Sequence, residues 1–160
     1  MIDRKPMSLW GVGPIFTTIS VLITIVSIVI HKCTYPSFSM EIMPAIVFEV
    51  FGIGFMIFGF IIWFSGAVLA KIDKNIKEDK LVTTGIYAYV RNPIYSGIWF
   101  FLTGLLIIYH SYIMVGLPIL FYILLRVLVK KEEKVLTERF GQEYLTYKKN
   151  TNAVFPTVNL

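Results

Sequence analysis

The chain has 160 residues, of which 56% are hydrophobic and only 16% are charged. A soluble domain usually carries about a quarter charged residues, and the apolar residues here come in long blocks, which indicates an integral membrane protein. The formal net charge of +5 does not indicate a nucleic-acid partner, because the basic residues flank the apolar blocks, where anionic lipid headgroups attract them.

The first apolar block, residues 11–30, is about 20 residues long, the length of one bilayer-spanning helix. Arg4 and Lys5 precede it, so a secretory signal peptide is the rival interpretation. The block is long for a signal peptide, and no small-residue cleavage site follows it. We therefore predict a helix that is retained in the membrane.

The second apolar block covers residues 43–69, which is longer than one bilayer core and predicts tilt or a protruding end. Four small residues recur every seven positions on one helix face: Ala45, Gly52, Gly59 and Gly66. A helix face made of small residues allows another helix to approach closely in lipid, so helix packing is the preferred interpretation. A seam that lines a cofactor is the alternative.

Glu49 is the one acidic residue inside an apolar block. An ionisable group at the centre of a membrane helix costs around 2.5–3.5 kcal/mol on insertion scales, which favours a functional role. Its position near the outer end of the predicted helix offers a second explanation, namely contact with the bilayer interface.

The third apolar block, residues 95–128, would be roughly 50 Å long as a single helix, which exceeds one bilayer core. Residues 109–112, a Tyr-His-Ser-Tyr sequence, interrupt it, and tyrosines beside polar groups suit the membrane interface. We predict a tight hairpin of two short spans, with Pro118 bending the second.

Four spans place both termini on one side of the membrane. Fourteen of the 15 Lys and Arg residues then lie on that side and only Lys32 lies opposite, so the positive-inside rule assigns both termini to the cytosol. The histidines, His31 and His110, fall on the outer side and are interpreted as interface residues.

Cys33 is the only cysteine, which excludes an intrachain disulfide and a zinc site built from cysteines. No spacing suggests another metal site.

The first cytosolic segment begins with a charge run, residues 71–80, which is interpreted as a solvated helix end. The residues that follow differ, because Gly85 permits a turn and Pro93 pushes Asn92 away from helical geometry. Arg91 offers a rigid, permanently charged set of donors that would suit a ligand carboxylate. The alternative is an arginine that reaches toward lipid headgroups.

The second cytosolic segment carries an apolar stripe at spacings of four, four and three residues: Leu136, Phe140, Tyr144 and Tyr147. This spacing predicts one amphipathic helix, which we expect to lie over the cytosolic mouth of the bundle.

An acidic pair, Glu132 and Glu133, comes about one turn after the predicted membrane exit. Arg126 precedes Glu133 by seven residues, so the two share a helix face and are able to pair. Paired acids would suit an ammonium group or ribose hydroxyls. The alternative is that both acids solvate the helix among neighbouring lysines.

Residues 81–97, LVTTGIYAYVRNPIYSG, are followed some 35 residues later by EEKVLTERFGQEYLTYKK and then by Phe155-Pro156. Together these motifs resemble the isoprenylcysteine carboxyl methyltransferase and phospholipid methyltransferase superfamily. The resemblance covers about 81–156, roughly half of the chain. It implies an all-α, multi-pass membrane enzyme that binds S-adenosylmethionine in a cytosolic-side pocket. We expect one domain over residues 1–160, with the cofactor-binding part at about 81–156.

Carried over by motif, one wall of the pocket is formed by Gly85, Tyr87, Arg91, Asn92, Pro93, Tyr95 and Gly97, and the other by Glu132, Glu133 and Tyr144. Arg91 and Glu133 are the expected catalytic residues. The chain departs from many members in having Asn92 in place of histidine and Ile86 in place of proline. Asparagine forms hydrogen bonds but does not titrate near neutral pH, so a role of that position as a base is in doubt.

The expected activity is methyl transfer to a lipid-like or isoprenoid-linked acceptor, and the absence of a cytosolic histidine favours a carboxylate, which needs no base, or an acceptor whose proton loss is driven by the substrate itself. The superfamily also includes reductases. Reductase activity is less favoured here, because the chain is short and the Glu pair matches the methyl-transfer members. A small proton-coupled transporter that uses Glu49 is the alternative from another class, and a non-catalytic scaffold is the third. Neither the acceptor nor the oligomeric state follows from the sequence.

Overall fold

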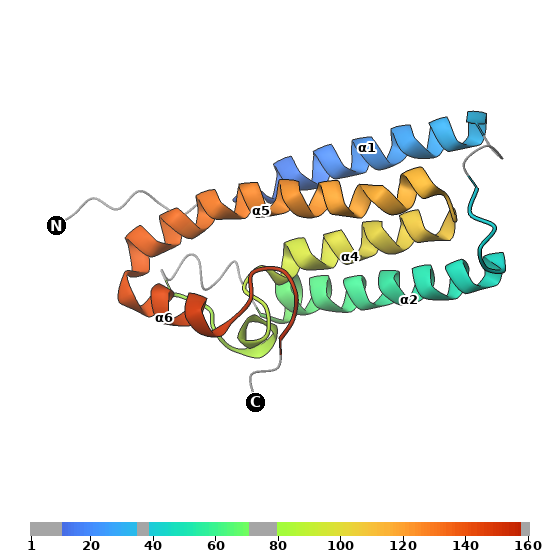
Figure 1. The fold of residues 1–160 in the computed structure, drawn as a ribbon. Coiled ribbons are helices and arrows are strands. Elements are labelled where there is room, and N and C mark those ends of the chain that lie inside the picture. The colour runs from blue at the N-terminus through green and yellow to red at the C-terminus, as the bar shows by residue number, and fades with distance from the viewer. Residues whose placement is uncertain (1–10, 35–38, 71–79, 158–160) are drawn as a thin grey trace.

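Four apolar helices form the bundle, and successive helices run in opposite directions along a common axis (Figure 1). The computed structural model describes residues 11–34, 39–70 and 80–157. The helices are α1 (Gly13–Thr34), α2 (Ala45–Phe64), α4 (Pro93–Ile108) and α5 (Tyr112–Phe140), followed by a short α6 (Gln142–Asn150). The described residues contain isolated bridges but no β-strand, which confirms the all-α prediction.

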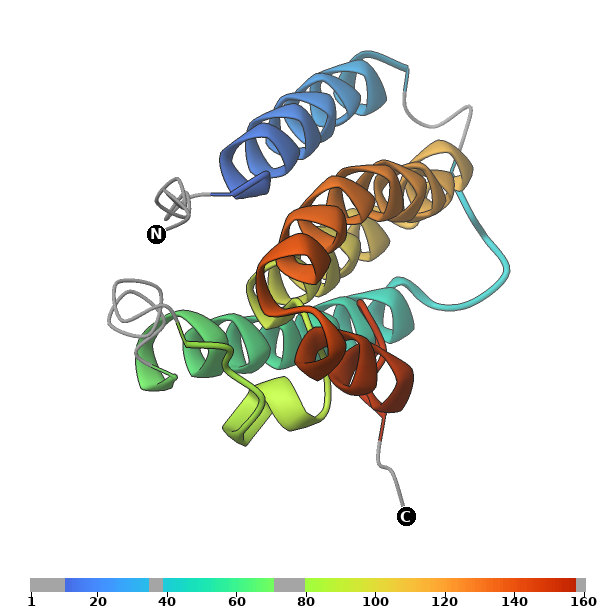
Figure 2. The same ribbon diagram turned by 90° about the vertical axis from the view of Figure 1, so that its left-hand side faces the viewer.

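Three segments are long and apolar enough to cross a membrane: α1, α5, and α2 together with the π-helical turn η1 (Ser65–Leu69). The shorter α4 has 16 residues, so it is about 24 Å long. Figure 2 shows α4 and α5 lying between α1 and α2. The protein is therefore a multi-pass helical membrane protein, as the apolar blocks predict.

The hairpin between α4 and α5 is present, with its turn at residues 109–111. The second arm differs from the predicted short span, because α5 is one helix of 29 residues, about 44 Å long, that contains Pro118. Strong helix formers follow the apolar part of α5, so the helix continues past the length of one bilayer core. Its C-terminal part therefore carries Glu132 and Glu133 beyond that core.

The apolar stripe predicted on one amphipathic helix is divided between two helices. Gly141 adopts φ = +54°, a left-handed conformation that glycine tolerates, and α5 ends there. Leu136 and Phe140 lie on α5, whereas Tyr144 and Tyr147 lie on α6. The chain turns back at Gly141, and all four side chains still line one cavity.

The seven-residue glycine repeat of α2 packs against α4, which confirms the close-packing interpretation. A Cβ atom on Gly59 would lie 2.5 Å from the backbone nitrogen of Phe101 and 2.6 Å from the carbonyl oxygen of Gly97. Gly52 similarly faces Gly104. Because α4 carries its own glycines seven residues apart, the two backbones approach along the whole contact.

The end of the bundle opposite α6 holds both histidines. The ring of His31 packs edge-on against Tyr109 at 5.6 Å between centroids, and His110 lies 5.9 Å from Phe48. Glu49 is exposed near the start of α2, at this same end.

Candidate active site

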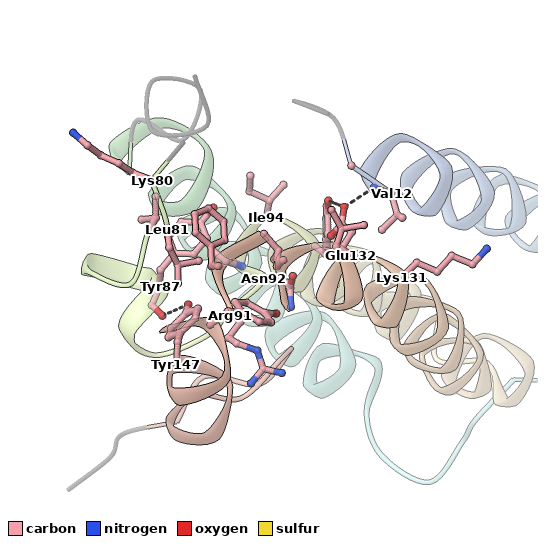
Figure 3. A pocket seen from close by; sticks show the side chains of 18 residues that line it. Val12, Lys80, Leu81, Tyr87, Arg91, Asn92, Ile94, Lys131, Glu132 and Tyr147 are labelled. Carbon is pink, nitrogen blue, oxygen red and sulfur yellow. Dashed lines mark hydrogen bonds between the residues drawn. The ribbon is translucent and has the colours of Figure 1, made fainter. Parts of the chain in front are cut away.

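A cavity of about 370 Å³ opens at the end of the bundle where α1 and α4 begin (Figure 3). This volume lies within the range of small-molecule pockets, roughly 300–1,000 Å³. Its lining comes from four parts of the chain: Gly11 and Val12 before α1, residues 80–82 with 87 and 91–95, the C-terminal part of α5, and Tyr144 and Tyr147 of α6.

Seven of the ten residues expected at the cofactor pocket line this cavity: Tyr87, Arg91, Asn92, Pro93, Tyr95, Glu132 and Tyr144. The other three do not. Gly85 begins the 3-10 turn η2 (Gly85–Ala88), Gly97 packs against Gly59 and Trp63 of α2, and Glu133 is engaged in ion pairs.

The turn before α4 places Arg91 and Asn92 at the cavity wall. Asn92 has φ = −124° and ψ = 62°, because the proline that follows disfavours helical geometry. Pro93 then occupies the first turn of α4, where its missing N–H costs nothing. The backbone N–H of Ser96 donates to the carbonyl oxygen of Asn92 at 2.9 Å and continues the helix.

The guanidinium of Arg91 is bound by protein groups on several sides. Its Nη2 lies 2.5 Å from Oε1 of Glu133, and its Nη1 donates to the carbonyl oxygens of Lys148 and Thr151. Lys148 Nζ adds a second ion pair with Glu133 Oε2 at 2.8 Å. The ion pairs of Glu133 are therefore with Arg91 and Lys148 and not with Arg126, because α6 folds back beside α5.

Glu132 points in a different direction from Glu133, since one residue along a helix is a rotation of about 100°. Its Oε1 accepts hydrogen bonds from the Val12 backbone N–H at 2.6 Å and from the Tyr95 hydroxyl at 2.8 Å. Figure 3 shows Glu132 beside Val12 at the cavity. The two acids thus do not form one paired anionic site: Glu132 faces the cavity and joins α5 to α4 and to the start of α1.

The approach of the chain before α1 to Glu132 requires Gly11. Gly11 adopts φ = +47°, and a Cβ atom there would overlap the Glu132 carboxylate. Sequence reasoning did not identify Gly11 and Val12 as cavity residues. The signal was the Gly-Val-Gly-Pro sequence at residues 11–14, two glycines that precede a helix-starting proline.

Aromatic residues make up much of the remaining lining. The Tyr147 hydroxyl donates to the Tyr87 carbonyl oxygen at 2.6 Å and links α6 to η2. Burial, aided by the charge of Glu133, raises the pKa of Tyr144 to about 12. Burial also raises the pKa of Tyr87 and of Tyr147. These phenols remain neutral at physiological pH and offer aromatic faces and hydrogen bonds rather than a base.

The lining contains no histidine. Its carboxylate, Glu132, already accepts two hydrogen bonds, and Arg91 is ion-paired. Lys80 and Lys131 also line the cavity. The cavity therefore offers groups of both charges and aromatic faces, which suit it to binding and orienting an amphipathic molecule more than to removing protons.

Helices long and apolar enough to cross a membrane, with a cavity at one end of the bundle, define a membrane protein with a candidate small-molecule site. The sequence model of the phospholipid methyltransferase family matches residues 47–143, and the chain belongs to this family. The match begins within α2 and ends in the first turn of α6. The superfamily resemblance seen in the motifs is confirmed.

The chain is also similar to the protein-S-isoprenylcysteine O-methyltransferase of Schizosaccharomyces pombe. The two are 28% identical over 138 residues, which cover 81% of this chain and 58% of the relative. The chain thus spans less than two thirds of the length of that relative. No observation on the structure or the relatives supports the transporter alternative, and Glu49 lies at the end of the bundle away from the cavity.

Proposed function

We propose that this chain is a membrane-embedded methyltransferase that binds S-adenosylmethionine and methylates a lipid-like acceptor at the cytosolic surface. The observation that carries the proposal is the cavity itself, in which the turn around Arg91, the carboxylate of Glu132 and the aromatic residues of α6 converge. The family membership and the similarity to an O-methyltransferase support it.

The residues of the cavity fit S-adenosylmethionine, which when bound supplies an electrophilic methyl group on a cationic sulfur. Glu132 offers a carboxylate to a cation, and the rings of Tyr95 and Tyr144 add cation–π attraction. Asn92 donates its side-chain amide to the Ala153 carbonyl oxygen at 2.9 Å, so its own oxygen is left as an acceptor for a ligand donor.

The two acids and Arg91 have separate roles in this proposal. Val12 and Tyr95 hold Glu132 in place, so that its carboxylate faces the ligand without reorganisation. Glu133 and Arg91 act as positioning residues, because their ion pair joins the turn before α4 to α5. Fixed placement of donor and acceptor supplies roughly 7–11 kcal/mol of the barrier reduction in well-oriented reactions.

The acceptor proposed is a carboxylate attached to a lipid-like group. A carboxylate is already ionised at neutral pH, whereas an amine with a pKa near 10 must first lose a proton. The cavity lining offers no histidine, and its tyrosines are neutral. The residues that surround the site thus favour an acceptor that needs no base.

The cytosolic placement rests on the basic residues at the cavity end of the bundle. Lys130, Lys131, Lys134, Lys148 and Lys149 are exposed on α5 and α6. Under the positive-inside rule this end, and with it both chain ends, faces the cytosol. In a Cys33→Ser background, which removes the exposed native cysteine, measuring whether a membrane-impermeant cysteine-reactive label reaches an introduced Lys149→Cys from outside intact cells tests this orientation, since the proposal expects no labelling.

The proposed function is tested by incubating the purified chain with labelled S-adenosylmethionine and a membrane lipid extract, and by identifying the molecule that gains the methyl group. We expect Glu132→Gln to weaken S-adenosylmethionine binding, measured by calorimetry, by about one to two orders of magnitude, because a charged contact is worth roughly 1.5–3 kcal/mol. Glu143→Gln, an exposed acid on α6, is the matched control and should bind normally. A wild-type chain that binds no S-adenosylmethionine would contradict the proposal and favour a non-catalytic scaffold.

A further inference from the structure

The chain after α6 returns to the turn that carries Arg91 and Asn92. We call residues 151–157 the C-terminal strap. The Arg91 backbone N–H donates to the Asn152 carbonyl oxygen at 2.8 Å, and the Thr157 N–H donates to that of Tyr89 at 3.0 Å. A parallel bridge pairs Val90 with Asn152 beside the first of these contacts. Residues 152–153 therefore follow residues 90–92 in parallel, and the strap then bends so that Thr157 returns to Tyr89.

The strap also binds the side chains of two cavity residues. The Arg91 guanidinium donates to the Thr151 carbonyl oxygen, and the Asn92 amide nitrogen donates to that of Ala153. These contacts decide which atoms of Arg91 and Asn92 are left for the cavity. Ala153 and Val154 are buried in the bundle core, so this part of the strap is held in a fixed register.

Phe155 fastens the strap to the helices. Its ring stacks on Tyr122 of α5 at 5.3 Å between centroids and meets Trp99 of α4 edge-on at 5.4 Å. Trp99 is itself fixed by a 2.9 Å hydrogen bond from its indole nitrogen to the Pro118 carbonyl oxygen. Phe155 lies outside the cavity lining, so its effect on a ligand would be indirect.

We propose that the C-terminal strap sets the geometry of Arg91 and Asn92 for cofactor binding, and that Phe155 is the positioning residue that holds the strap. This inference rests on the proposed function. The strap lies beyond residue 143, where the match to the family ends. Each hydrogen bond of the strap contributes about 0.5–1.5 kcal/mol net, and each aromatic pair of Phe155 contributes a similar amount beyond its area burial, so the ring adds to the hydrogen bonds that hold the strap.

Calorimetry with S-adenosylmethionine separates positioning from a purely structural role, because it gives a dissociation constant and a binding stoichiometry independently. We expect Phe155→Ala to raise the dissociation constant about tenfold, equivalent to about 1.4 kcal/mol, with the stoichiometry unchanged. Phe155→Tyr should restore the wild-type constant because it keeps the ring. Leu145→Ala, which truncates a similarly exposed apolar side chain on α6, should leave both quantities unchanged.

An unchanged dissociation constant in Phe155→Ala overturns the inference, whether or not the stoichiometry falls. Should that variant not fold, Phe155→Leu keeps apolar volume without the ring, and an unchanged constant there has the same consequence. A wild-type chain that binds no S-adenosylmethionine overturns both the proposed function and this inference. Wild-type binding that Phe155→Ala retains at full affinity overturns this inference alone.

Discussion

Replacement of Glu133 by glutamine tests whether the ion pair with Arg91 organises the end of the bundle. The side chains of Arg91 and Glu133 are 7% and 9% exposed, so water screens their attraction little. Removing one partner of a buried ion pair costs about 3–5 kcal/mol, because the other charge remains buried. Glutamine still accepts a hydrogen bond and Arg91 keeps two carbonyl partners, so we expect a loss near the lower limit, about 3 kcal/mol.

Thermal unfolding in detergent measures this loss, which should lower the midpoint by roughly 6–12 °C for a chain of this length. Glu138→Gln is the matched control, since Glu138 lies 4.0 Å from Lys134 with 67% of its side chain exposed. An exposed pair of this kind contributes at most about 0.5 kcal/mol. We also expect Glu133→Gln to lower turnover more than Glu138→Gln. Equal midpoints and equal turnover for the two variants would refute the reasoning and leave Glu133 as part of a solvated helix face.

Two further changes test the cavity wall and the helix contact. Arg91→Ala should weaken S-adenosylmethionine binding by one to two orders of magnitude, on the order of 1.5–3 kcal/mol, because the cavity wall loses its ion pair. Calorimetry measures this loss, with exposed Lys134→Ala as the control. Equal affinities of the two variants for S-adenosylmethionine would count against the prediction. Gly59→Ala should destabilise the fold by about 1–3 kcal/mol in thermal unfolding, because its Cβ would meet the α4 backbone. Gly54→Ala on the same helix meets nothing within 4 Å and should be tolerated, so a similar loss there would argue against close packing as the cause.

Much of the fold follows from local sequence features. The lengths of the apolar blocks indicate where helices cross the membrane, and the polar residues around His110 mark the turn between α4 and α5. The glycine repeat of α2 predicts a close contact with another helix, but the repeat alone does not identify which helix that is. The end of α5 at Gly141 was missed, because the apolar stripe continues across it with unbroken helical spacing.

Spacing rules predict only the part of the candidate site whose residues are neighbours in the sequence, whereas the motif resemblance also placed Glu132 and Tyr144 at the pocket. Arg91, Asn92 and Pro93 form one turn, so their common position at the cavity follows from local geometry. The separate directions of Glu132 and Glu133 depend on Tyr95, Val12 and Lys148, residues brought in by other helices. Val12 meets Glu132 across a separation of 120 residues, and no spacing rule within a single helix predicts such a contact.

The lining of the cavity comes from both extremes of the described chain. Val12 closes one side through Glu132, and Tyr144 and Tyr147 close another, yet all three lie outside the segment that matches the family, residues 47–143. A truncated protein made from that segment alone would keep the glycine-packed pair of α2 and α4, but its cavity would lack lining residues on two sides. The matched segment therefore lacks part of the cavity lining, and shortening the chain from either direction removes residues that line this cavity.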